Sequence, residues 1–236
     1  MSFLLTLAIT TALALALRKP LQRRPGVFYA LALLSTGFYL YANYIDTSLY
    51  GAPWPLALVQ RGGVALALFA LVMFAGVFAK GSKPRALLLP LRRQLAIIGF
   101  ILALGHIVVY TATFAPQLFD DDIRLDRNIV ASLAVALAVT LLLAALAATS
   151  PVAVRKLIAP ARWKRVQTLA YPFFLLIFLH LALVLLPSAL AGSVDVAVSL
   201  AVYAALFASY GVLRLRRNRL DKGGAVETAP ALEAAH

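Results

Sequence analysis

The 236-residue chain contains no cysteine and few charged residues. Without cysteine it cannot form a disulfide, a cysteine-bound iron–sulfur cluster, a thiolate metal site or a cysteine nucleophile. Charged residues make up only 13 % of the chain, hydrophobic residues make up 63 %, and the mean hydropathy is +0.90. These values lie far outside the range of soluble globular domains. The composition therefore predicts a polytopic integral membrane protein embedded in a lipid bilayer.

Acidic residues are also scarce, since nine Asp and Glu stand against 22 Lys and Arg, for a formal net charge of +13. Nucleic-acid-binding proteins gather basic residues on one water-exposed face. Here the basic residues form short clusters between apolar runs. We therefore predict no nucleic-acid partner and interpret the clusters as markers of membrane topology.

Seven apolar runs are candidates for helices that cross a hydrocarbon core about 30 Å thick. The predicted spans are 2–17, 27–45, 62–79, 94–114, 129–149, 166–186 and 194–213. Most Lys and Arg residues lie in four clusters, which follow the first, third, fifth and seventh runs. Because short cytoplasmic loops retain positive charge, the N-terminus is predicted to lie outside and the C-terminus inside.

Two histidines, His106 and His180, are predicted to lie deep within spans. His106 comes 13 residues after Arg93 and His180 comes 15 residues after Arg165, which gives rises of about 20 and 22 Å at 1.5 Å per residue. Both helices are predicted to run outward from the cytoplasm, so the two imidazoles reach nearly the same depth in the outer half of the bilayer. This arrangement suits ligation of a haem iron by one imidazole on each face.

Two other interpretations of these histidines are open. Either residue alone could form an interhelical hydrogen bond, although intramembrane ionisable residues are functional candidates by default. A non-haem metal would require a third ligand nearby, and the spans contain no cysteine and no further histidine.

Two segments resemble a known family. The segment 92–110 reads RRQLAIIGFILALGHIVVY and the segment 163–180 reads WKRVQTLAYPFFLLIFLH. Both are similar to helices of the ferric-reductase-like transmembrane domain family. The shared features are a double Arg, a His thirteen residues later, a Tyr four residues further, and a Trp, Tyr and His at fixed spacing. Within the family, the sequence most resembles the MsrQ-type haem-binding membrane subunits of a methionine sulfoxide reductase system.

The resemblance implies a fold and a division of the chain. It covers about 27–213 and implies an all-α integral membrane protein, with a six-helix ferric-reductase-like bundle plus one extra N-terminal helix. Residues 1–25 would form the extra transmembrane helix and a basic loop, and 26–213 the haem-binding transmembrane domain. Independently of the resemblance, the basic cluster and the polar, Ala-rich composition after the seventh run predict a basic, disordered cytoplasmic tail over 214–236.

The same resemblance implies that His106 and His180 are axial ligands of one haem b near the outer face. Where the family commonly has another histidine, near the cytoplasmic end of the later helix, this chain has Gln167. A second bis-histidine haem is therefore not expected. Gln167 is either a hydrogen-bonding residue for a bound FMN or quinone, or a structural amide at a helix terminus.

Two further residues are candidates for cofactor binding. Arg61 and Gly62 begin the third span in a pair that resembles a Gly-Arg step of the family. The Arg61 guanidinium could pair with a haem propionate, or it could be an interfacial arginine that extends toward water. Tyr110 lies one turn after His106 on the same helix face, where it would either bond a propionate or belong to the aromatic belt.

Together these features predict an electron-transfer subunit of an oxidoreductase in the bacterial inner membrane, with no catalytic residue of its own. It would carry electrons from a quinol or a cytoplasmic flavin reductase to an extracytoplasmic oxidoreductase, which would dock on the acidic segment 120–126. The chain has no Rossmann-like glycine pattern, so hydride chemistry is assigned to a partner. The alternatives are a haem-free small-solute transporter or membrane scaffold, and a haem protein that reduces ferric or cupric ions directly.

Overall fold

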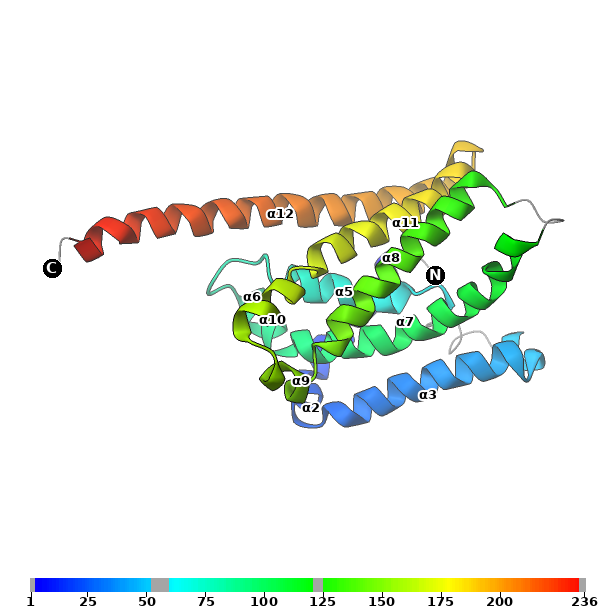
Figure 1. The fold of residues 1–236 in the computed structure, drawn as a ribbon, viewed down its shortest axis with the longest axis horizontal. Helices are drawn as coiled ribbons and strands as arrows, with labels where there is room; N and C mark the ends of the chain where they lie inside the picture. The colour runs from blue at the N-terminus through cyan, green and yellow to red at the C-terminus, as the bar shows by residue number, and fades with distance from the viewer. Residues whose placement is uncertain (1–2, 52–59, 121–124, 234–236) are drawn as a thin grey trace.

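The computed structural model describes residues 3–51, 60–120 and 125–233, and these residues form helices and turns without any strand. The helices are α1 (Phe3–Ala16), α2 (Arg18–Arg23), α3 (Pro25–Tyr44), η1 (Thr47–Gly51), α5 (Gly63–Phe74), α6 (Lys83–Leu88), η2 (Leu89–Leu91), α7 (Arg92–Phe114), η3 (Pro116–Phe119), α8 (Arg127–Ala148), α9 (Val152–Leu157), α10 (Pro160–Gln167), α11 (Ala170–Leu190) and α12 (Val194–Glu233). The predicted all-α membrane fold is confirmed. Figure 1 shows the long helices packed side by side.

Each of the seven predicted spans coincides with a helix, but the helices differ in length. Five helical segments are long and apolar enough to cross a membrane: α3, α7 with its flanking short helices, α8, α11 together with α10, and α12. The other two, α1 and α5, have 14 and 12 residues. A 12-residue helix rises about 18 Å, which is shorter than the hydrocarbon core. The total of seven crossings and their inside–outside orientation therefore remain predictions.

The short helix α5 lies at the centre of the bundle. Nine consecutive residues, from Ala65 to Met73, are buried, so the helix is covered on every side. It contributes to both hydrophobic clusters, one with α3 and α7 and the other with α1, α11 and α12. A Cβ atom added at Gly99 of α7 would come within 3.0 Å of the Phe69 ring, so a glycine lets α7 approach α5 closely.

The sixth predicted span, 166–186, is divided in the structure. α10 ends at Gln167 and α11 begins at Ala170, with a turn at Thr168 and Leu169. Pro172 explains the break, because a proline cannot donate to the carbonyl four residues earlier and its ring collides with that carbonyl, here Thr168. The Tyr171 amide donates to the Thr168 carbonyl instead, at 3.1 Å.

The outer surfaces of the bundle are strongly apolar. Large side chains stand exposed on α3, α8 and α11, such as Leu34, Leu137 and Leu175, which are 70 %, 61 % and 64 % exposed. Exposure of this kind is unfavourable in water but expected where a helix faces lipid. The structure is therefore that of a multi-pass membrane protein.

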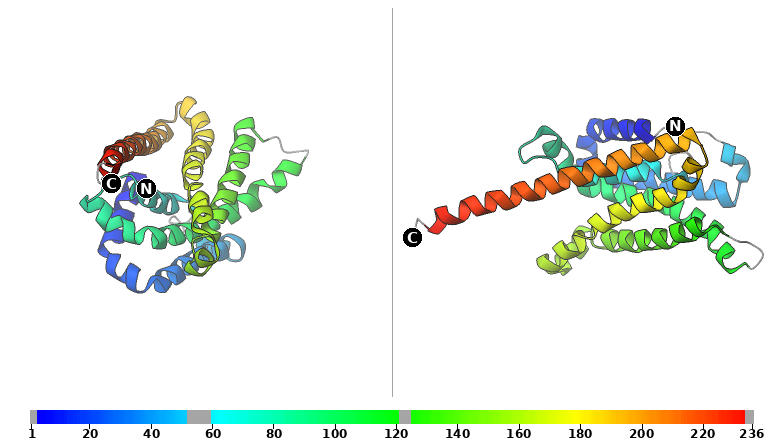
Figure 2. Two further views of the ribbon diagram at one scale, coloured as in Figure 1. Left: turned by 60° about the vertical axis from the view of Figure 1, so that its left-hand side comes forward. Right: turned by 90° about the horizontal axis from the view of Figure 1, so that it is seen from above.

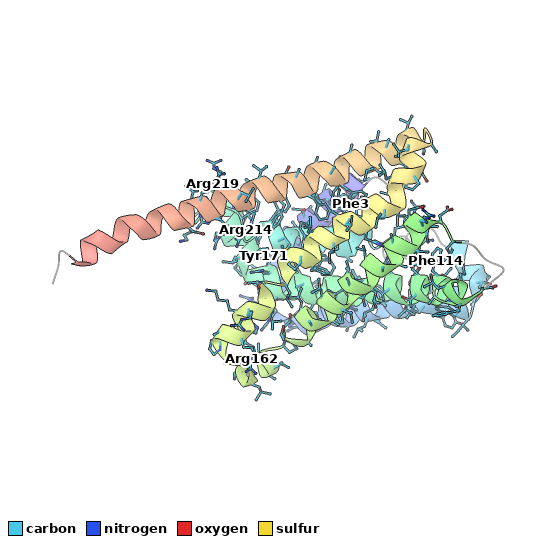
Figure 3. The ribbon with its side chains drawn as sticks, turned by 45° about the horizontal axis from the view of Figure 1, so that its top comes forward. Phe3, Phe114, Arg162, Tyr171, Arg214 and Arg219 are labelled. Carbon is cyan, nitrogen blue, oxygen red and sulfur yellow. The ribbon has the colours of Figure 1, made fainter. Side chains whose placement is uncertain are left out.

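The basic clusters gather at one end of the molecule. Figure 1 shows α2, α6, α9 and α10 at the same end, and Figure 3 places Arg162 and Arg214 toward it and Phe114 toward the other. We call these the basic end and the opposite end. Figure 2 shows α12 continuing past the basic end of the bundle. The segment 214–236 was predicted to be a disordered tail, but the structure continues α12 to Glu233, and 234–236 are not described.

Candidate functional site

The His106 side chain lies on α7 and is held by the segment that leads into α5. Its Nδ1 atom lies 3.0 Å from the Gln60 carbonyl oxygen. A carbonyl oxygen can only accept, so Nδ1 carries the proton and Nε2 keeps its lone pair. Gly62, with φ +63°, lies against the same ring, and a Cβ atom there would be 3.6 Å from Cγ of His106. The left-handed turn thus brings backbone directly against the imidazole.

The His180 side chain lies on α11 and is held by α8. Its Nδ1 atom lies 3.0 Å from the Ser132 hydroxyl oxygen and 3.2 Å from the Ser132 carbonyl oxygen. The carbonyl favours the tautomer with the proton on Nδ1, which again leaves the Nε2 lone pair available. Ser132 is only 3 % exposed, so this contact is enclosed where α8 and α11 pack closely together.

The two histidines lie in the interiors of two long helices, His106 on α7 and His180 on α11. The helices that carry them are built into different packing groups, because α7 packs mainly on α3 and α5, whereas α11 packs mainly on α8 and α12. The two imidazoles, each with a carbonyl oxygen at Nδ1, are therefore carried by helices that have few direct contacts.

Tyr110 and Arg61 both lie beside His106. The Tyr110 ring centroid is 4.4 Å from that of His106, and the planes are tilted by 38°. Phe114 stacks on Tyr110 at 6.2 Å, so three rings follow one face of α7 toward its end. Arg61 stands between Gln60 and Gly62 and is exposed.

Gln167 belongs to a different set of contacts. It ends α10 at the basic end, and its Nε2 donates to the Thr149 hydroxyl at 3.2 Å. The Trp163 indole donates to the Thr149 carbonyl at 3.2 Å, and the Arg155 guanidinium lies 4.6 Å from the centre of the same indole. These contacts join α8, α9 and α10. They favour the structural interpretation of Gln167.

Sequence reasoning missed Ser132 and Gln60. Ser132 had a signal, since it is a lone hydroxyl in the apolar run IVASLAVALAV over 129–139. Gln60 acts through its backbone carbonyl, which any residue type supplies. The residue type at position 60 therefore could not predict the contact with His106. The acidic segment 120–126 lies partly outside the described residues, since 121–124 are not described.

Among the described residues no three His, Asp or Glu side chains form a metal-binding group. The chemistry of the site rests on two imidazoles. Two nitrogen ligands on separate helices suit the axial positions of haem iron, whose other four ligands come from the macrocycle, whereas a tetrahedral zinc site needs three or four protein ligands.

Comparison with known proteins identifies the family. Residues 61–178 match the family described as Ferric reductase like transmembrane component, a region that includes His106 and ends two residues before His180. A protein of Treponema pallidum (strain Nichols), described as an uncharacterized protein, is 36 % identical over 168 residues, or 71 % of this chain. The chain spans 46 % of that relative's length. No solved structure matches significantly. Because the family match covers half of the chain, the protein belongs to the ferric reductase like transmembrane component family, which indicates a role in membrane electron transfer.

Proposed function

We propose that the protein binds one haem b between α7 and α11, with His106 and His180 as axial ligands, and carries single electrons through the membrane. One observation carries this proposal. Each imidazole is held through Nδ1 by a carbonyl oxygen, at 3.0 Å for His106 and 3.2 Å for His180. Metal-bound histidines have this arrangement, because a hydrogen bond at the second ring nitrogen fixes the tautomer and orients the first nitrogen toward the metal.

A bound haem would supply a one-electron Fe(III)/Fe(II) couple. The protein's own residues define how that couple is used. If His106 and His180 both bound the haem iron, they would leave no coordination site for oxygen or a substrate, which would favour electron transfer over oxygen activation. Gln60 and Ser132 hold the imidazoles in place. Arg61 is the proposed partner of a propionate, and Tyr110 packs on the His106 ring.

The proposed direction of transfer follows from the predicted topology. The basic end is assigned to the cytoplasm, and the spacing from the basic clusters predicts that both histidines lie in the outer half of the bilayer. We propose that electrons enter from a quinol or a cytoplasmic flavin reductase and leave to an extracytoplasmic oxidoreductase, as in MsrQ-type subunits of methionine sulfoxide reductases. The bacterial inner membrane is the proposed location, and a bacterial relative supports it.

One haem does not cover the full distance that electrons must travel across the membrane. We propose that an FMN or quinone near Gln167 carries them over the remaining part. The support for it is the position of Gln167 at the basic end, among cationic and aromatic side chains. The hydrogen bond from Gln167 to Thr149 weighs against it. Cofactor extraction from matched variants, described in the Discussion, separates the two roles.

The experiment that tests the haem proposal is a dithionite-reduced minus oxidised absorbance spectrum of the purified protein, with His106→Ala and His180→Ala beside the wild type. The expected result is a b-type α-band in the wild type that is lost in both variants. The control is His236→Ala, which removes the third histidine of the chain and should keep the band.

The rival functions give different spectra. A colourless wild-type protein, folded and expressed with haem supplied, would contradict the proposal and favour a small-solute transporter or scaffold. A haem band together with rapid reoxidation by ferric chelates, and none by a protein acceptor, would favour a ferric reductase acting directly at the membrane surface.

A further inference from the structure

An apolar cavity of about 390 Å³ lies between the first helix and the rest of the bundle, away from both histidines. It is bounded by residues of α1, α5, α6, α12 and the turn after α5: Leu7, Thr11, Leu15, Ala70, Leu71, Phe74, Phe78, Lys83, Pro84, Leu87, Leu88 and Leu206. The Thr11 hydroxyl donates to the Leu7 carbonyl at 2.7 Å and is satisfied within its own helix. Lys83 is therefore the one lining residue with a charged group to offer.

The dimensions of the cavity suit a hydrocarbon chain. Its wall on α1 extends from Leu7 to Leu15, a distance of eight residue steps that rise about 12 Å. One leaflet of the hydrocarbon core is about 15 Å deep. The cavity volume lies in the ordinary range for small-molecule sites, and its walls would bury an acyl chain without leaving a polar group unpaired.

The charge at the basic end of the cavity suits an anionic headgroup. Lys80 is already paired with Asp221, at 3.3 Å. The Arg85 guanidinium donates to the carbonyls of Gly76 and Phe78, at 3.4 and 3.1 Å. Lys83 has no carboxylate within ion-pair distance among the described residues. Of the three cations in this loop, Lys83 is the one left for an anion from outside the protein.

We propose that this cavity binds one acyl chain of an anionic phospholipid, and that Lys83 pairs with the phosphate of its headgroup. The lipid would fill the space between α1 and the bundle formed by α5, α6 and α12. This site does not depend on haem binding, so the two proposals stand or fall separately.

The test uses the full-length protein in detergent, with phosphatidylglycerol and phosphatidylcholine of identical acyl chains added in equal amounts, and native mass spectrometry as the readout. We expect one tightly retained phosphatidylglycerol, preferred about fivefold, the factor for one lysine near an anionic headgroup. Lys83→Gln should remove the preference while chain binding persists. Lys156→Gln, an equal charge change on exposed α9, should keep the preference.

A second pair of variants tests the cavity itself. Thr11→Trp should fill the cavity and abolish retention of either lipid. Ser35→Trp is its matched control, because Ser35 also donates to the carbonyl four residues earlier and lines a separate apolar cavity of about 200 Å³. Equal retention of the two lipids by the wild type, or equal effects of Thr11→Trp and Ser35→Trp, would overturn the proposal. So would recovery of a quinone in place of phospholipid. If Thr11→Trp does not fold, the comparison of Lys83→Gln with Lys156→Gln tests the proposal by itself.

Discussion

Ser132 and His180 are joined twice, since the His180 Nδ1 atom lies 3.0 Å from the Ser132 hydroxyl oxygen and 3.2 Å from its carbonyl oxygen. One buried residue of α8 thus orients an imidazole on α11, and its carbonyl favours the tautomer with the proton on Nδ1. The two contacts have different origins. The carbonyl belongs to the backbone and survives any substitution, whereas the hydroxyl belongs to serine.

Ser132→Ala should therefore weaken haem binding without abolishing it. Loss of a contact behind a metal ligand typically lowers metal affinity 10- to 100-fold, and the remaining carbonyl keeps the expected loss near about 10-fold. Titration of haem into the haem-depleted protein measures it. Ser199→Ala is the control, because the exposed Ser199 hydroxyl bonds only the Asp195 carbonyl of its own helix, at 2.8 Å. Equal affinities in the two variants would show that the hydroxyl has no part in the site.

Gly62→Ala should disturb the His106 side of the site through the backbone. Gly62 has φ +63°, and a non-glycine residue in this left-handed region costs about 1–2 kcal/mol. We expect a lower melting temperature and reduced haem content. Gly63→Ala is the matched control, because Gly63 is the first residue of α5 and has open space around its Cβ position. A Gly62→Ala variant with the same melting temperature and the same haem content as Gly63→Ala would contradict the assigned role of the turn.

Arg61→Gln should lower the midpoint potential of a bound haem. A guanidinium beside a propionate stabilises the reduced, more negative form, so its removal favours the oxidised form. The expected change is about 60 mV or less, which corresponds to a tenfold change for one electron. Potentiometric titration measures it. Arg24→Gln, an exposed arginine at the basic end, should leave the potential unchanged.

Tyr110→Leu should alter the low-spin electron paramagnetic resonance signal of a ferric haem, because the ring that limits rotation of His106 is lost. Tyr110→Phe keeps that ring and should preserve the signal. Phe114→Leu, one ring further from His106, should also preserve it. If Tyr110→Phe shifts the midpoint potential as much as Arg61→Gln does, the tyrosine hydroxyl bonds a propionate.

Gln167→Leu should lower thermal stability without changing cofactor content. It removes the 3.2 Å hydrogen bond to Thr149, and such a bond contributes about 1 kcal/mol. Thr149→Val removes the same bond from the other side and should cost a similar amount. Extraction of FMN and quinone from both proteins distinguishes the roles. Loss of either molecule in Gln167→Leu, with retention in Thr149→Val, would assign Gln167 to a cofactor.

Much of the fold could be predicted because the membrane imposes simple constraints. Long apolar runs must become helices to satisfy their backbone groups in lipid, and each predicted span contains a helix. The reduced length of α5 could not be predicted, because its apolar sequence does not reveal whether lipid or protein surrounds it. The position of the break before α11 follows from Pro172, because Thr168, at the fourth position before the proline, marks where the helix must open.

The candidate site, like the fold, could be predicted only in part. The spacing of His106 and His180 from their basic clusters predicted similar depth, and the structure places both histidines in the interiors of long helices, α7 and α11. Their supporting contacts come from a backbone carbonyl at Gln60 and from a serine on another helix. Neither supporting contact follows from the number of residues between a histidine and its basic cluster, so that spacing could not predict the contacts.

The central position of α5 has a consequence for how the protein enters the membrane. A 12-residue helix is too short to be integrated from the translocon into lipid as an independent span. Its buried faces, from Ala65 to Met73, meet other helices rather than acyl chains. We therefore expect α5 to depend on its neighbours for a stable position in the membrane, and those neighbours limit which substitutions its centre tolerates.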